Sequence, residues 1–506
     1  MTEVGYLVLY AIGVLALLVF GLNLFVLAVG FARHDRQISG RVPEPDSSET
    51  PDDSWPVVTV QLPVYNEALV IAGLIDACAR LDYPPSLLEI QVLDDSTDET
   101  SDIAARRVLL WRRRGVDIAH IRRPARTGYK AGALENGLAL SRGELIAIFD
   151  ADFLPAADFL RRMVPSFHDK RIGMVQSRWS HQNAGRSLLT RLQAFGIDEH
   201  FAVEQRVRNL MGWFMNFNGT AGIWRRTCID DAGGWRADTL TEDLDLSYRA
   251  QLKGWKFVYR PDVTVPAEIP DDMNAFRAQQ FRWTKGAAQT ATRMLPKLWR
   301  SSAPTGVKLQ GTFHLTAHFV YPFILLLALL HAPLLWLNHV GGFAGDTYFA
   351  ALGIGLLGFA GFFVSQLLAQ RELYVDWSRR MLLFPVFMSA SAGLAASNGR
   401  GIFEALLRRE SPFVRTPKRL SGAPEDRPIV MRYRDTSIPI VAYVEALLAL
   451  YSLAGLVLTL RIGAWVAVPF QLVFVVGFGL VAAFTFIDAL GARWRVEASE
   501  AGPVRG

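Results

Sequence analysis

The stretch Leu145–Asp152, LIAIFDAD, decides how the longest polar region of this chain folds. Five apolar residues end directly in two aspartates, which is the pattern of a buried strand followed by a turn. Toward the N-terminus the sequence predicts three similar strands with helices between them: strands at Val57–Leu62, Glu89–Leu93 and Ile118–Ile121, and helices at Ala68–Leu81, Glu99–Arg113 and Ala131–Leu140. Because strands that alternate with helices form parallel sheets, we predict a mostly parallel, doubly wound α/β domain.

Acidic residues follow two of these predicted strands. Asp94 and Asp95 end the second strand, and Asp150 and Asp152 end the fourth. Ligands bind at the carboxyl ends of strands in such sheets, and the D-x-D spacing there suits a hard divalent cation that bridges phosphates. A lone D-x-D motif is more often a turn or a helix cap. Two acidic groups in one sheet, with Lys130 between them in a Gly-Tyr-Lys-Ala-Gly context, favour a diphosphate site.

The composition indicates an integral membrane protein. Of 506 residues, 51% are hydrophobic and 20% are charged, whereas soluble domains carry nearer a quarter charged residues. A net charge of +5 is too small, in so apolar a chain, to indicate a nucleic-acid partner, and we expect none. Two cysteines, Cys78 and Cys228, cannot make a disulfide framework, and we expect both to be reduced.

Five long apolar stretches are predicted to span the lipid bilayer. Four hold no charged residue and one holds only Glu445; they are Val4–Phe31, Thr312–Asn338, Thr347–Gln370, Ser437–Leu460 and Ile462–Ile487. The first is too long for a signal peptide and lacks a basic front end, so we interpret it as an uncleaved anchor. The flanking Lys and Arg residues favour an outside N-terminus and cytoplasmic polar regions. We expect a multi-pass protein of the bacterial inner (plasma) membrane.

The uncharged stretch Met381–Gly399 is short and contains Pro385 and many small residues. If it crossed the membrane, the basic region Arg400–Arg434 would lie outside, against the charge rule. We therefore predict that Met381–Leu407 is a helix along the cytoplasmic interface rather than a sixth span.

Three more motifs lie between the predicted sheet and the second span. They are Phe217-Asn218-Gly219-Thr220, Thr241-Glu242-Asp243 and Gln279-Gln280-Phe281-Arg282-Trp283. Each has an ordinary explanation, since acids in a first helical turn cap the helix and aromatic residues beside Arg form interfacial belts. Only their combination indicates a function.

Taken in order, Asp94-Asp95, Asp150-Ala151-Asp152, Thr241-Glu242-Asp243 and Gln279–Trp283 resemble the D, DxD, TED, QxxRW signature of processive family 2 glycosyltransferases, such as cellulose, chitin and hyaluronan synthases. Longer strings, including QVLDDSTDET, FNGTAGIWR and TEDLDLSYRAQLKGWKF, are most similar to the cellulose synthase-like A and C proteins and their bacterial relatives, which make β-mannan or β-glucan backbones. The resemblance is strong over roughly Pro56–Gly286.

This resemblance implies a GT-A fold with a mixed sheet, a nucleotide-sugar donor (UDP-glucose or GDP-mannose), Mg²⁺ or Mn²⁺, and inversion at the anomeric carbon. Asp243, with Thr241 and Glu242, matches the catalytic motif, because an acceptor hydroxyl is a poor nucleophile until a carboxylate takes its proton. The metal residues would be Asp150 and Asp152. The donor-binding residues would be Tyr65, Glu67, Asp94, Asp95, Lys130, Asp150, Gln279 and Arg282, and the acceptor-binding residues Phe217, Asn218, Gly219 and Trp283.

The sequence PFVRTPK at 412–418 resembles the gating loop of cellulose synthases through Phe413, Thr416 and Lys418. It departs from the family pattern at Arg415, where the family has Val, and at Pro417. The 16 residues after Leu490 are too few for a further regulatory domain, and we expect none.

The predicted organisation has eight parts. They are a transmembrane helix (1–32), a linker (33–55), a cytoplasmic GT-A domain (56–275), interface helices with QxxRW (276–310), two transmembrane helices (311–370), a cytoplasmic interface helix with the gating-like loop (371–435), two transmembrane helices (436–490) and a cytoplasmic tail (491–506).

Several alternatives stay open at this point. The acceptor is a growing polysaccharide or, as in ceramide glucosyltransferases, a membrane lipid. A transporter or channel with a regulatory binding domain is a third possibility, which the acidic clusters disfavour. His314 and His318, four residues apart, have the spacing of a metal pair, although hydrogen bonding between helices is the commoner use. Glu445 would line a pore or an interface.

Overall fold

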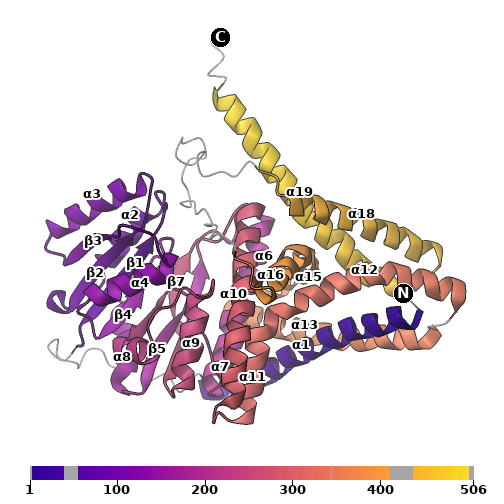
Figure 1. The fold of residues 1–506 in the computed structure, drawn as a ribbon, viewed down its shortest axis with the longest axis horizontal. Coiled ribbons are helices and arrows are strands. Elements are labelled where there is room, and N and C mark those ends of the chain that lie inside the picture. Colours follow the sequence, from indigo (N-terminus) through magenta and orange to yellow (C-terminus); the bar gives the residue numbers. More distant parts are fainter. Residues whose placement is uncertain (1–2, 39–54, 343–344, 411–436, 501–506) are drawn as a thin grey trace.

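The computed structural model describes residues 3–38, 55–342, 345–410 and 437–500. An α/β domain occupies one end of the molecule and a bundle of long helices the other, and α10 (Met273–Arg300) and α11 (Thr305–Thr316) stand between them (Figure 1).

The α/β domain is built on one seven-stranded sheet in the order β3-β2-β1-β4-β6-β5-β7. The strands are β1 Val58–Val64, β2 Leu88–Asp94, β3 Ile118–Arg122, β4 Leu145–Ile148, β5 Ile172–His181, β6 Gly222–Arg225 and β7 Lys256–Ala267. All paired neighbours are parallel except β6, which is antiparallel to both β4 and β5. The four predicted strands are confirmed, and the whole is a mixed sheet of GT-A type.

Alternate residues of the central strands enter two different cores. On β4, Leu145 and Ala147 belong to one core, whereas Ile146 and Ile148 belong to the other. Because successive side chains of a strand point to opposite faces, a strand apolar throughout must be covered on both sides. This explains why LIAI is uninterrupted and why helices cover both faces of the sheet.

The helices of the domain are short. They are α2 Ile71–Cys78, α3 Thr100–Arg112, α4 Tyr129–Leu140, α5 Phe159–Met163, α6 Leu188–Glu199, α7 Arg206–Leu210, α8 Arg226–Asp231 and α9 Glu242–Leu252. A single π-helical segment, His200–Gln205, joins α6 to α7, so Leu188–Leu210 is one continuous helical run.

Five helical segments of the described chain are long and apolar enough to cross a membrane, which makes this a multi-pass membrane protein. They are Val4–His34 in α1 (Glu3–Ile38), Thr305–Gly341 comprising α11 and α12 (Val320–Gly341), Gly353–Leu373 in α13 (Gly345–Leu373), α18 (Ile440–Arg461) and Trp465–Gly491 in α19 (Val468–Glu500). Glycines let α1 and α13 touch: a Cβ on Gly21 would lie 2.3 Å from the Gly358 backbone.

The segment predicted as one interface helix over Met381–Leu407 is two helices. They are α15 (Phe384–Gly393) and α16 (Ala395–Leu406), preceded by the single turn α14 (Trp377–Arg380), and the two parts are bent by 44°. α15 packs among the bundle helices, since a Cβ on Gly393 would lie 2.2 Å from the Gly477 carbonyl of α19. Its place along the membrane surface rather than across it stays a prediction.

Buried ion pairs join α10 to the bundle. Arg277 donates to Glu445 of α18 at 2.7 Å and to the Thr485 hydroxyl of α19 at 2.6 Å. Lys285 donates to Glu404 of α16 at 2.9 Å. Glu445 is fully buried and lines neither cavity described below; of the two expected positions, a pore or an interface, it occupies the interface between α18 and α10.

Candidate functional site

Two cavities meet between the sheet and the bundle. The strand-end cavity has a volume of ≈ 210 Å³ and lies at the carboxyl ends of the strands. The membrane-side cavity, of ≈ 390 Å³, continues between α6, α10, α12, α15 and α19. The side chains that line both are Trp179, Ile197, Asn218, Thr241, Asp243 and Trp283. Asp243 therefore lies where the two cavities join.

The D-x-D aspartates both line the strand-end cavity. Asp150 accepts a hydrogen bond from Lys130 Nζ at 2.5 Å, and the same ammonium donates to the Gly219 carbonyl at 2.8 Å. Asp152 is 6% exposed. Lys130 is the second residue of α4, whose N-cap is the left-handed Gly128, so the start of this helix carries the cation toward the strand ends.

The donor set fits a divalent cation that shares its coordination with a phosphate. Among the described residues no cluster of three His, Cys, Asp or Glu side chains could hold a metal alone. Mg²⁺ and similar ions, however, bind through one or two carboxylates together with substrate phosphates and water. Asp150 and Asp152 satisfy that requirement, and Lys130 lies where it would contact the same phosphates.

The far end of the strand-end cavity is lined by Tyr65, Glu67 and Asp95, as predicted from the sequence. Two arginines that sequence reasoning missed support them. Arg123 Nη2 donates to Asp95 at 2.5 Å, and the Arg126 guanidinium stacks 3.4 Å from the centre of the Tyr65 ring. Both arginines precede α4. Together with Arg122 they form a basic cluster in the sequence, and this cluster was the signal that could have identified them.

Asp94 does not line either cavity. Its carboxylate is buried and accepts hydrogen bonds from His120 Nε2 and from the Ser96 backbone N–H, each at 2.8 Å. Burial alone would raise the pKa of Asp94, but these hydrogen bonds outweigh it and lower the pKa to about 2. Asp94 therefore holds the β2 turn, and its predicted contact with the donor is not retained.

Thr241, Glu242 and Asp243 form the start of α9 and are held by α10. The Leu240 backbone N–H donates to Gln289 at 2.9 Å, and a Cβ on Gly286 would lie 2.5 Å from the Thr241 methyl group. Only a glycine at this position of α10 allows such close packing. The motif therefore lies on a rigid support that belongs to the membrane-proximal helix.

The carboxyl group of Asp243 is buried and lies beside the negative charge of Glu242. Burial, and next the charge of Glu242, raise the pKa of Asp243 to about 7, although Lys130 acts in the opposite direction. Burial also raises the pKa of Glu242. Arg282 lines the same cavity, and burial lowers its pKa while the neighbouring acids oppose that shift. The strand-end cavity thus holds more acids than cations: seven carboxylates line it, against Arg126, Lys130 and Arg282.

The predicted acceptor residues divide into two groups. Asn218, Gly219 and Trp283 line the strand-end cavity, and a Cβ on Gly219 would lie 3.0 Å from Asp243 Oδ2. Phe217 is fully buried and packs edge-on against Trp224, with ring centroids 5.7 Å apart. It belongs to the core of the domain and not to the site. Gln279 lines the strand-end cavity as expected.

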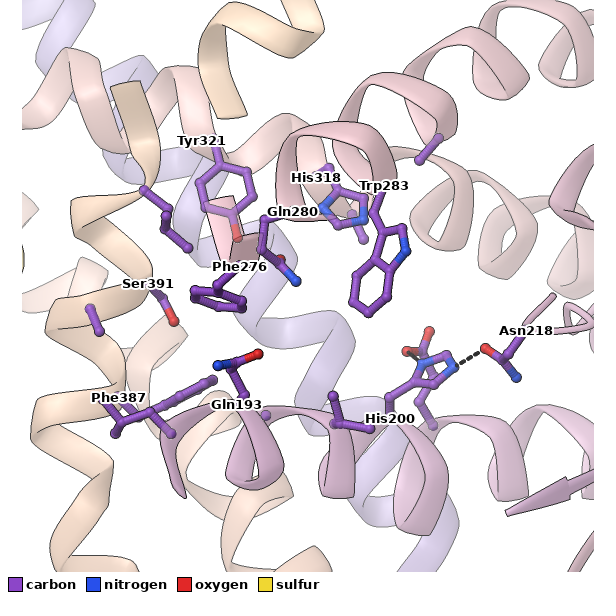
Figure 2. Close-up of a pocket in the computed structure, with 18 of the residues that line it drawn as sticks. Gln193, His200, Asn218, Phe276, Gln280, Trp283, His318, Tyr321, Phe387 and Ser391 are labelled. Carbon is purple, nitrogen blue, oxygen red and sulfur yellow. Dashed lines mark hydrogen bonds and ion pairs between the residues drawn. The ribbon is translucent and has the colours of Figure 1, made fainter. Parts of the chain in front are cut away.

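The membrane-side cavity is lined mainly by aliphatic and aromatic side chains, with polar groups and the acids Glu204 and Asp243 among them, and the sequence motifs indicated only a few of these residues. Figure 2 shows Trp283 beside His318, the hydrogen-bonded pair His200 and Asn218 below them, and Phe276, Gln193, Ser391 and Phe387 on the other side of the cavity. The residues that no motif indicated come from helices far apart in the sequence, which is why no local pattern revealed them.

The metal-pair hypothesis for His314 and His318 finds no support. His314 shares one ring nitrogen with the Tyr248 hydroxyl at 2.9 Å and the other with the Asn216 side chain at 3.2 Å. Its nitrogens are thus already used in hydrogen bonds between elements. The gating-like residues Phe413, Arg415, Thr416 and Lys418 lie outside the described residues.

Comparisons with known proteins agree with this geometry. Residues 56–286 match the family described as "Glycosyltransferase like family 2". Glucomannan 4-beta-mannosyltransferase 1 of Oryza sativa subsp. japonica is 43% identical over 286 residues, covering 56% of this chain and 54% of that protein. Glucomannan 4-beta-mannosyltransferase 2 of Arabidopsis thaliana is 45% identical over 261 residues, covering 51% and 49%. The chain spans about half the length of these curated relatives.

A solved structure shares the fold. The mannosyltransferase PcManGT from Pyrobaculum calidifontis, in complex with GDP-Man and Mn²⁺, superposes with a TM-score of 0.52 at 21% identity, covering 79% of this chain and all of that one. Together with the family match and the seven-stranded mixed sheet, this likeness identifies residues 56–286 as a glycosyltransferase family 2 domain of GT-A type.

Proposed function

We propose that this chain is a membrane-embedded, inverting hexosyltransferase that extends a β-linked polysaccharide processively and passes it toward the membrane. GDP-mannose is the preferred donor in this proposal, because the relatives are named mannosyltransferases and the solved neighbour binds GDP-Man. The observation that carries the proposal is the place of Asp243 between a charged cavity and an aromatic one.

Asp243 is the proposed catalytic base. Its carboxylate takes the proton from the acceptor hydroxyl as that oxygen attacks the anomeric carbon, and the bond to the nucleoside diphosphate breaks on the opposite face. A base works best when its pKa lies near the working pH, which a pKa of about 7 provides. Attack from the face opposite the leaving group gives inversion.

The leaving diphosphate is stabilised by the cations of the strand-end cavity. Lys130 and Arg282 face the place where its negative charge develops. Asp150 and Asp152 are the residues that would hold Mg²⁺ or Mn²⁺, which when bound offsets the same charge. Tyr65, Glu67, Asp95 and Gln279 are left to contact the remainder of the donor.

The membrane-side cavity is the proposed acceptor channel. Trp283 offers an indole face to a sugar ring, and aromatic and amide side chains continue beyond it toward the bundle (Figure 2). Aromatic faces and amides bind neutral sugar rings, which lets a chain move onward after each transfer. A lipid acceptor would instead place its apolar chains in this cavity. The identity of the product distinguishes a polysaccharide acceptor from a lipid acceptor.

The purified full-length protein, tested with radiolabelled GDP-mannose and UDP-glucose in the presence of Mn²⁺ or Mg²⁺, should form a polymer from GDP-mannose. Products are resolved by size on a gel and by digestion with β-mannanase. A product that stays with the lipid fraction and carries a single sugar would contradict the polymer proposal. Absence of turnover with every nucleotide sugar would contradict the enzyme itself.

The membrane arrangement is part of the proposal. The N-terminus would lie outside a bacterial inner membrane, with the catalytic domain, α16 and the segment Arg408–Lys418 in the cytoplasm. Single cysteines placed in 408–418, in a background without the buried Cys78 and Cys228, would be labelled only from the cytoplasmic side. Labelling from outside would mean that the bent pair at 377–406 crosses the membrane.

A further inference from the structure

The helical run α6–α7 contains a π-helical segment beside the membrane-side cavity. His200–Gln205 has π-helical geometry, and its side chains His200 and Glu204 line the cavity. In an α-helix, residues five apart point about 140° away from each other. The wider π turn brings them closer to one face, and such turns occur often at functional sites. Here it directs both His200 and Gln205 to the same loop, Asn216–Thr220.

His200 holds this loop through Asn218. Its Nε2 lies 2.9 Å from Asn218 Oδ1, and its Nδ1 lies 2.9 Å from Glu204 Oε2 (Figure 2). Both partners are acceptors, so both ring nitrogens donate. Burial would lower the pKa of His200, but the Glu204 carboxylate outweighs burial and raises it, in agreement with a doubly protonated ring.

Gln205 holds the same loop at Asn216, two residues before Asn218. Its Nε2 donates to the Asn216 carbonyl at 2.9 Å, and Asn216 Nδ2 donates to Asn218 Oδ1 at 3.0 Å. The Asn218 oxygen thus receives two hydrogen bonds, which fixes the orientation of its amide. The Asn218 backbone N–H is held separately by Gln176 at 3.0 Å.

The loop forms the wall beside Asp243. The Gly219 carbonyl accepts from Lys130, and a Cβ on Gly219 would lie only 3.0 Å from Asp243 Oδ2. Asn218 lines both cavities. An acceptor hydroxyl that reaches Asp243 from the membrane side must therefore pass the edge that Asn218 and Gly219 present.

We propose that His200 is a positioning residue for the acceptor: held by Glu204 in the π turn, it fixes the Asn218 amide and so sets the wall against which the acceptor hydroxyl meets Asp243. This inference rests on the proposed glycosyl transfer. His200 does not line the strand-end cavity, so we expect donor binding to be independent of it.

The test compares transfer to sugar with hydrolysis of the donor, in which water replaces the acceptor. His200→Ala should lower transfer from GDP-mannose to added short β-mannan oligosaccharides by roughly ten- to hundredfold, the loss expected for a hydrogen bond to a charged group. Donor hydrolysis and GDP affinity should stay at the wild-type level. If correctly folded His200→Ala protein loses transfer and hydrolysis together, the proposal is overturned.

A double-mutant cycle tests whether His200 acts through Asn218. Asn218→Ala should give a similar loss, and the double variant should be no worse than Asn218→Ala alone, because the two residues form one contact. Losses that multiply would overturn the proposal. If His200→Ala fails to fold, the cycle uses His200→Gln, which keeps an N–H for Asn218 and should recover part of the transfer.

The matched control is His168→Ala, since His168 is an exposed histidine that lines neither cavity. It should leave the ratio of transfer to hydrolysis unchanged. If the wild-type protein neither transfers nor hydrolyses any nucleotide sugar, the proposed function has failed. A wild-type protein that is active while His200→Ala keeps its full transfer ratio contradicts only the role of His200.

Discussion

The two cavities that meet at Asp243 are built in opposite ways. The strand-end cavity is lined by acids and cations, among them Lys130, Asp150 and Arg282, which lie in short motifs at the ends of neighbouring elements. The membrane-side cavity is lined mainly by aliphatic and aromatic side chains, with amides, hydroxyls, histidines and the acids Glu204 and Asp243 among them. The difference fits the proposed function, with a charged donor on one side and a sugar chain on the other.

The comparison also shows why Asp243 needs its position. On the charged side it has Lys130 and Arg282 as neighbours, and on the other side it has Trp283 and Asn218. A base placed wholly among cations would have a low pKa and would accept protons poorly. Burial beside Glu242 keeps the pKa near 7 instead. Substitutions in the strand-end cavity and substitutions in the membrane-side cavity should therefore have effects on activity that can be told apart.

The largest effect is expected at the junction itself. Asp243→Asn should lower sugar transfer by about 10²–10⁴-fold, because only proton removal from the acceptor is lost. Binding of GDP, measured by calorimetry, should be unchanged. Asp238→Asn, which changes an exposed acid just before α9, is the control. Turnover near the wild-type level would remove Asp243 from the role of base.

The second prediction tests the strand-end cavity alone. Asp152→Ala should weaken Mn²⁺-dependent binding of GDP by at least about tenfold, since loss of groups around a bound metal commonly costs ten- to a hundredfold in affinity. Binding measured without metal should change little. The exposed Asp158→Ala is the control. Equal binding by the wild-type and Asp152→Ala proteins, with and without Mn²⁺, would contradict the assignment.

The third effect is a dependence on pH. Asp243 must be ionised to accept a proton, so transfer should fall about tenfold per pH unit as the pH drops below 7. The stability effect has the opposite sign. Because the pKa in the folded protein lies above the ordinary aspartate value of 3.8, the folded state binds this proton more tightly, and stability is lost as the pH rises toward 7.

Asp243→Asn cannot ionise, so it should raise the melting temperature at pH 8 relative to wild type and change it little at pH 4. Thermal unfolding of both proteins at the two pH values measures this. A variant that melts lower at pH 8 would mean that the charge of Asp243 is stabilised in the folded protein.

The smallest effect is expected for substitutions in the membrane-side cavity. Trp283→Ala should weaken acceptor binding by roughly three- to tenfold, the range expected for an aromatic contact, and should shorten the polymer while donor hydrolysis persists. Trp299→Ala, which removes an exposed tryptophan from the same helix, should leave product length unchanged. Unaltered polymer length in Trp283→Ala would remove this residue from the acceptor site and weaken the processive proposal.

The sequence predicted those strands that are buried in the fold and that also follow a recognisable strand pattern. The run at Leu145–Ile148 is apolar because both faces of that strand are covered. Strand β7 escaped detection because it contains Pro261 and Pro266, which break the usual strand pattern and are tolerated at a sheet edge such as this one.

The errors at the site concern neighbouring residues whose side chains point in different directions. Asp95 faces the strand-end cavity whereas Asp94 is turned into the β2 turn, and Asn218 faces both cavities whereas Phe217 enters the core. A motif identifies the segment, but only the backbone path decides which side chain reaches the ligand. The membrane-side cavity lay beyond prediction because its residues meet only after the helices have packed.

The ion pair between Arg277 and Glu445 has a consequence for biosynthesis. Its two members are separated by 168 residues, and both are buried in the finished protein. At typical translation rates of 5–20 residues per second, the arginine waits roughly 8–34 s before its carboxylate is synthesised. During that interval α10 carries an uncompensated cation at the bilayer surface, so the helix that bears the QxxRW motif reaches its final place only when the last two helices insert. A chain that stops before α18 should therefore fail to hold Arg282 and Trp283 in the proposed site.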